Sequence, residues 1–83
     1  MSHARDVVEV IARALADEPD EVKIVETAQR GMTLLELSVS PADLGRIIGR
    51  QGRTAAALRT LVAATAERDG DKVTLEIRET LPA

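Results

Sequence analysis

The sequence predicts an α+β fold in which helices pack over one face of a three-stranded sheet. Three segments repeat apolar residues every three or four positions, as amphipathic helices do, and three others alternate apolar and polar residues, as half-buried strands do. Their order along the chain is helix, strand, strand, helix, helix, strand. A length of 83 residues with 45% hydrophobic content suits one globular core, so residues 1–83 are expected to form a single domain.

The first half of the chain predicts a helix followed by a hairpin. Segment 2–17 carries apolar residues at helical spacing, namely Val7, Val8, Ile11, Ala14 and Leu15. Pro19 interrupts this pattern, and the short alternation over 22–27 favours a strand. The turn signal Gln29-Arg30-Gly31 leads into a second strand. The face of that strand directed at the core is expected to carry Leu35, Leu37 and Val39.

The second half predicts two helices and a closing strand. Ser40 is expected to accept from free helix amides, Pro41 suits the first helical position, and Asp43 favours the positive dipole end, so a helix should run from Pro41 to about Ile48. The run from Arg53 to about Arg68 predicts a helix whose apolar stripe is Ala55, Leu58, Val62 and Ala66. Asp69-Gly70-Asp71 ends it. The last strand is predicted by the alternation of Val73, Leu75 and Ile77.

Composition excludes several classes of function. The chain has no cysteine, which excludes disulfides and thiolate metal sites, and its single histidine, His3, argues against a nitrogen-rich metal or catalytic centre. No nucleophile and base are arranged for catalysis, so neither an enzyme nor a cofactor is expected. The acidic residues from Asp17 to Glu21 lack the alternation and glycine of an EF-hand and are expected to form a solvated turn.

No apolar stretch approaches the ~18 residues that cross a bilayer. The first thirteen residues include Arg5, Asp6 and Glu9, where a secretion signal would be apolar. A cytoplasmic location is therefore expected.

Charge is concentrated on one segment of the chain. The net charge is -3, which is unusual for a protein that binds phosphates. Segment 44–66, however, holds four arginines and no acid, so it carries +4, while the remainder carries 7 minus 14, or -7. The chain has no aromatic residue, so stacking of bases on Phe, Tyr or Trp is excluded. Binding of nucleic acid would therefore need another kind of contact.

Such a contact is predicted at Gly49 and Gly52, two glycines that are separated by two residues and lie between two predicted helices. Glycine lets the backbone turn sharply and removes side chains that would keep a ligand away. The helix after Gly52 directs unpaired amides and the positive end of its dipole at this loop, which favours a phosphate there. Arg50 and Arg53 add positive charge. A nucleotide-binding P-loop is excluded, since it needs Lys followed by Ser or Thr and a wider glycine spacing.

The predicted site extends onto both flanking helices. Ile47, Ile48 and Leu58 are expected to form an apolar floor for bases, which suits a single strand better than a duplex. Amides from Gly49 to Thr54 are expected to hold the strand. Arg46 and Arg59 either contact phosphate or are simply solvated. The full predicted set is Arg46, Ile47, Ile48, Gly49, Arg50, Gln51, Gly52, Arg53, Thr54, Leu58 and Arg59.

The run Ile47-Ile48-Gly49-Arg50-Gln51-Gly52-Arg53 resembles the signature of the K-homology (KH) domain, whose GXXG loop clamps about four nucleotides. The order of elements resembles the bacterial, type II form. The resemblance covers essentially the whole chain, and residues 44–54 with Leu58-Arg59-Thr60 are similar to the KhpA family of stand-alone bacterial KH proteins. It implies an RNA-binding protein that acts as an RNA chaperone or post-transcriptional regulator. Many KH domains carry Ile or Leu where this chain has Ala55, so a wider or shallower groove is expected.

A single small module contacts few nucleotides, so useful affinity is expected to need two copies or a second RNA-binding protein. The resemblance implies a homodimer and pairing with a protein that carries a KH/R3H domain. The alanine-rich stretch from Ala55 to Ala66 either offers small residues for a dimer contact or is buried against the sheet. The alternative function is a protein-interaction scaffold whose loop does not serve RNA, which the acidic remainder of the chain favours.

Overall fold

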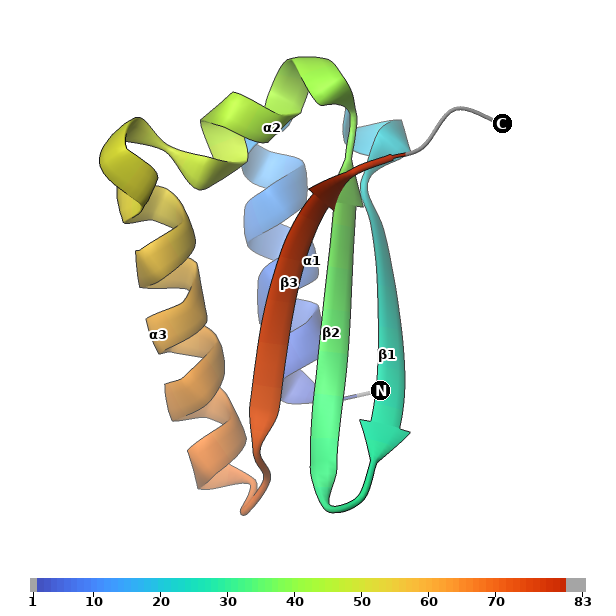
Figure 1. Cartoon of the computed structure of the whole chain (residues 1–83), viewed down its shortest axis with the longest axis vertical. Coiled ribbons are helices and arrows are strands. Elements are labelled where there is room, and N and C mark those ends of the chain that lie inside the picture. The colour runs from blue at the N-terminus through green and yellow to red at the C-terminus, as the bar shows by residue number, and fades with distance from the viewer. Residues whose placement is uncertain (1, 81–83) are drawn as a thin grey trace.

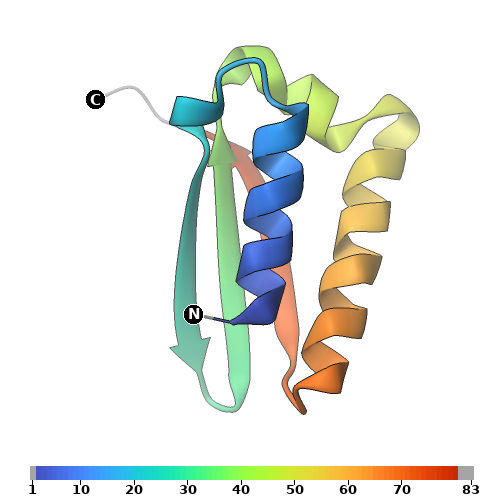
Figure 2. The same cartoon turned by 180° about the vertical axis from the view of Figure 1, so that it is seen from behind.

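The computed structural model describes residues 2–80, and their elements follow the predicted order. The helices and strands are α1 (His3–Leu15), β1 (Lys23–Gln29), β2 (Met32–Val39), α2 (Pro41–Ile48), α3 (Arg53–Arg68) and β3 (Val73–Glu79). Two short 3-10 helices, η1 (Pro19–Glu21) and η2 (Arg50–Gly52), lie in the connections. Helices α1 and α3 lie side by side over one face of the sheet, and α2 lies across its end (Figures 1 and 2). The predicted α+β fold class is confirmed.

The sheet has the order β1-β2-β3, with β2 in the centre. Strands β1 and β2 form the predicted antiparallel hairpin, joined by a tight turn in which Arg30 and Gly31 both have positive φ, 33° and 78°. Strand β3 pairs with β2 in parallel, with Leu35 opposite Leu75. A parallel pair needs a crossover connection that returns to the end of the sheet where the first strand began, and α2 and α3 form that crossover.

The core lies between the sheet and the α1–α3 layer. In β2 the three predicted core residues, Leu35, Leu37 and Val39, are fully buried. Helix α3 buries the stripe predicted for it, Ala55, Leu58, Val62 and Ala66. In α1 the deepest residues are Ala4, Val8 and Ala12, whereas Ala14, expected on the apolar face, is exposed. The buried face of α1 is therefore turned slightly from the predicted one, and two of its three buried residues are alanines, whose small side chains let α1 pack closely against α3.

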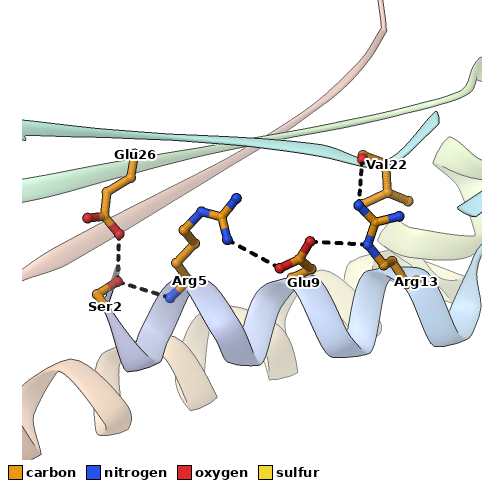
Figure 3. Close-up of polar contacts among 6 residues, drawn as sticks. All are labelled: Ser2, Arg5, Glu9, Arg13, Val22 and Glu26. Atoms are coloured by element: carbon orange, nitrogen blue, oxygen red, sulfur yellow. Dashed lines mark hydrogen bonds and ion pairs between the residues drawn. The ribbon is translucent and has the colours of Figure 1, made fainter. Parts of the chain in front are cut away.

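Polar side chains along α1 hold this helix beside β1 (Figure 3). The residues involved are Ser2, Arg5, Glu9, Arg13, Val22 and Glu26. Ser2 caps the helix by accepting from the Arg5 amide at 3.1 Å, and its hydroxyl donates to Glu26 Oε1 at 2.7 Å. The Glu9 carboxylate accepts from Arg5 and Arg13, each at 3.2 Å. Arg13 also donates to the Val22 carbonyl, so the far end of α1 is tied to the start of β1.

Neither a membrane span nor a metal cluster is found in the described part of the chain. None of its helices is both long enough and apolar enough to cross a bilayer. Between residues 2 and 80, no three or more histidine, aspartate or glutamate side chains come together as a potential metal site.

Candidate nucleic-acid interface

Helix α2 carries the glycine loop at its end, and a buried carboxylate fixes its start. The Asp43 side chain is only 1% exposed, and it accepts from the backbone amides of Asp17 and Glu18, both at 3.0 Å. The turn after α1 passes over the first turn of α2, and its free amides need these acceptors. Asp43 was expected to act only on the helix dipole. Its hydrogen bonds to the distant Asp17 and Glu18 amides are an additional role, and we call this arrangement the Asp43 anchor.

Ser40 was predicted to cap α2 by accepting a hydrogen bond from a free amide, and this prediction is wrong. Its side chain makes no cap hydrogen bond, and its hydroxyl donates to Asp43 Oδ2 at 3.2 Å. The Asp17 amide, the Glu18 amide and the Ser40 hydroxyl lower the pKa of Asp43, with a smaller contribution from the charge of Arg46, while burial acts in the opposite direction. Asp43 is therefore ionised near neutral pH.

The GXXG loop is a tight turn between α2 and α3. Gly49 has φ +79°, Gln51 has φ +58° and Gly52 has φ +73°. At Gly49 an added Cβ would lie 2.7 Å from Thr54 Cβ and 2.9 Å from the Thr54 amide nitrogen, so a side chain is sterically excluded. At Gly52 an added Cβ would meet nothing within 4 Å, so only its backbone angle favours glycine. The two glycines thus serve different purposes.

The loop is exposed, but only some of its amides are free. Arg50 and Gln51 are exposed, and Gly49, Gly52 and Thr54 are half-buried. The Gly49 amide donates to the Gly45 carbonyl at 2.8 Å, and the Gly52 amide donates to the Gly49 carbonyl at 3.1 Å.

The Arg53 amide also has an internal partner, since it donates to the Arg50 carbonyl. The amides of Arg50 and Gln51 have no acceptor among the described residues. The prediction that amides from Gly49 to Thr54 hold the strand is therefore narrowed, over residues 49–53, to the amides of Arg50 and Gln51. Successive free amides in such a turn form a small concavity that favours an anion.

The structure separates the four predicted arginines into two pairs. Arg50 and Arg53 are exposed beside the loop and form no ion pair within residues 2–80. Arg46, by contrast, places Nη2 3.0 Å from Asp17 Oδ2. Arg59 donates from Nε to the Leu75 carbonyl at 3.3 Å, which links α3 to β3. Only the first pair is free to meet a phosphate without breaking an existing contact.

The predicted apolar floor needs correction. Ile48 is 37% exposed next to the loop, but Ile47 and Leu58 are 0% and 2% exposed and belong to the core. Ile47 lies on the inward side of α2, and Leu58 belongs to the buried stripe of α3. A base cannot touch either of them while the core is closed. Ala55, expected to widen a groove, is also buried, so its small size affects the packing of α3.

The family model described as "KhpA/KhpB, KH domain" matches residues 5–77 of this chain. The chain belongs to this KH-domain family. Proteins called "RNA-binding protein KhpA" from Aquifex aeolicus and Clostridium perfringens are 44% and 45% identical to it over 79 and 73 residues. These matches cover 95% and 88% of this chain, and 100% and 97% of the relatives. A relative of the same name from Halalkalibacterium halodurans is 47% identical over 73 residues, or 88% of this chain and 96% of its own.

Solved structures of Era contain a similar fold. One is Era in complex with MgGDPNP and nucleotides of 16S ribosomal RNA, with a TM-score of 0.66, and another is Aquifex aeolicus Era Y63A bound to GDP and AlF4-, with a TM-score of 0.68. Each is 21% identical to this chain and covers 95% of it, while the chain spans 30% and 31% of the two Era chains. At this identity the likeness concerns the fold, and it agrees with the type II KH order of elements.

The contact between Gly49 and Thr54 makes a prediction for stability. Gly49→Ala should lower the free energy of unfolding by about 2 kcal/mol or more, because it adds a positive-φ penalty and a steric overlap. Gly52→Ala, with a similar φ but open space, should cost only about 1 kcal/mol. Gly45→Ala, inside α2, should be neutral or stabilising. Urea unfolding measures all three, and equal losses for Gly49→Ala and Gly52→Ala would contradict the role of Thr54.

The Asp43 anchor predicts a pH-dependent contribution to stability. Because the pKa of Asp43 is lower in the folded chain, its carboxylate stabilises the fold above the ordinary pKa of 3.8, and this contribution is lost as pH falls through the folded value. Wild type should therefore be more stable than Asp43→Asn at pH 7, and the gap should close below pH 3.8. Urea unfolding over a pH series measures the gap. Asp20→Asn, an exposed residue of the same turn, is the control and should show no such gap.

Proposed function

We propose that this chain binds single-stranded RNA, with the loop Gly49–Gly52 against the phosphodiester backbone. The observation that carries the proposal is an exposed turn in which two free amides, those of Arg50 and Gln51, adjoin two arginines that have no ion pair among residues 2–80. The naming of its relatives as RNA-binding proteins supports this function. The ribosomal RNA bound in one Era structure supports it further. Such a partner also favours a cytoplasmic location.

The geometry suits a single strand held mainly by its backbone. A phosphate at the Arg50 and Gln51 amides would also be screened by the guanidinium groups of Arg50 and Arg53. Ile48 offers apolar surface on which an unstacked base can lie. Contacts to phosphate carry no information about base identity, so binding should tolerate many sequences. Weak, tolerant binding is what an RNA chaperone or a broad post-transcriptional regulator requires.

The loop makes the decisive prediction. Replacing Arg50 and Gln51 with Asp should lower affinity for a short single-stranded RNA roughly tenfold or more, because carboxylates repel phosphate at the free amides. The control is the matching change of Gln29 and Arg30, which places the same substitutions in the exposed β1–β2 turn at the other end of the molecule. Fluorescence anisotropy measures affinity, and circular dichroism confirms folding. Equal losses in both variants would mean that net charge alone governs binding.

Salt dependence separates RNA binding from the alternative of a protein-interaction scaffold. A clamp that uses two or three phosphate contacts should give a slope of roughly -1.5 to -2 for log affinity against log salt. RNA binding that is absent, or that does not respond to salt, would favour the scaffold.

We also propose that the chain self-associates through the outer side of α3. In the alanine-rich stretch Ala55 and Ala66 are buried inside the domain, while Ala57 and Ala64 are exposed, which supports a contact with a second copy on the outer side. Leu61 is 48% exposed on the same side as these last two. A leucine flanked by small residues permits close packing of a second helix. Pairing of two modules would raise the effective concentration of each for a longer RNA.

Leu61→Glu should therefore shift the chain toward monomer in sedimentation velocity, because a charge would be buried at the contact. Val25→Glu, which places the same charge at an exposed apolar position of β1, is the control and should change the monomer fraction less. Adding an equimolar protein with a KH/R3H domain tests whether the same face accepts that partner. An unchanged dimer with Leu61→Glu would place the contact elsewhere.

A further inference from the structure

The acidic turn that follows α1 lies against the helix that leads to the RNA loop. Both views show the α1–β1 connection, with η1, beside the start of α2 (Figures 1 and 2). The side chain of Asp17, which is 71% exposed, meets Arg46 with Oδ2 and Nη2 3.0 Å apart. This contact bridges residues 29 positions apart in the sequence.

The structure fixes Asp17 in this position through its backbone. The amide of Asp17 donates to the buried Asp43 carboxylate, and so does the next amide, that of Glu18. On the other side, Arg13 donates from Nη1 to the Pro19 carbonyl at 2.7 Å. Since aspartate has a short side chain, a fixed backbone leaves its carboxylate little freedom to move away. The fold therefore holds the Asp17 carboxylate in the position where it meets Arg46.

Arg46 has the longer side chain of the pair, and it lies close to the loop. It precedes Gly49 by three residues, so it sits about one helical turn from the phosphate site. Its long side chain is 55% exposed and can reach either way. A carboxylate and a phosphate offer the same kind of oxygen to a guanidinium, so they compete for it. A surface ion pair of this kind is weak enough to exchange.

We propose that Asp17 competes with RNA phosphate for Arg46 and so lowers the RNA affinity of the chain. The inference rests on the proposed function, since it concerns the same strand on the same loop. Arg46 contributes fully to binding only after it leaves Asp17. The acidic turn thus keeps Arg46 from contacting RNA phosphate together with Arg50 and Arg53.

The test is a gain of affinity, which unfolding cannot imitate. Asp17→Asn removes the competing charge and keeps the backbone amide that Asp43 holds. It should tighten binding of a short single-stranded RNA about two- to fivefold, and the salt slope should steepen by about 0.7 as one more phosphate contact forms. The control is Asp20→Asn in the same turn, which removes an equal charge but has no contact with Arg46. It should raise affinity by much less.

A double-mutant cycle assigns the gain to Arg46. Arg46→Gln alone should change affinity little, and in the Asp17→Asn background it should abolish the gain. The inference is overturned if Asp17→Asn and Asp20→Asn act equally, or if the gain persists without Arg46. Failure of the proposed function has a different signature, because the wild-type chain would then not bind RNA at the loop and replacing Arg50 and Gln51 would have no effect.

Discussion

The close approach of α3 to the end of α2 depends on the missing side chain at Gly49. Thr54 occupies the space that a Cβ would need, so the first turn of α3 packs directly on the chain as it leaves α2. The connection must then reverse within η2, and it does so through positive φ at Gln51 and Gly52. A reversal this tight leaves the amides of Arg50 and Gln51 without internal acceptors. The anion-binding character of the loop thus follows from one steric contact.

Much of the fold was predictable because local signals agreed with the final packing. Helices α2 and α3 begin and end as predicted, since Pro41 sets one start and the two glycines interrupt the helical path. Strands β2 and β3 follow from strict alternation, which survives because the helices cover only one face of the sheet. The loop was recognisable for the same reason, as its glycines stand between two strongly periodic segments.

The parts that could not be predicted depend on contacts distant in the sequence. The Asp43 anchor joins positions 26 residues apart, and a local pattern at Asp43 indicates only a helix start. The sequence placed apolar Ile47 and Leu58 near the loop on two different helices, but it did not show that both side chains are sealed within the core. The pairing of Arg46 with Asp17 was equally hidden, because a run of acids looks like any solvated turn. Each of these features arises only when elements distant in the sequence pack together.

The parallel pairing of β3 with β2 has a consequence for how the chain folds as it is synthesised. The register joins Thr33 to Val73, so the last strand pairs with residues that lie 40 positions earlier in the chain. Such long-range pairing is slow compared with forming a hairpin or a helix. Until β3 arrives, Leu35 and Leu37 lack one flanking strand, and Arg59 lacks the carbonyl that steadies α3. A nascent chain therefore acquires a rigid binding surface only after Val73–Glu79 has been synthesised and has paired with β2.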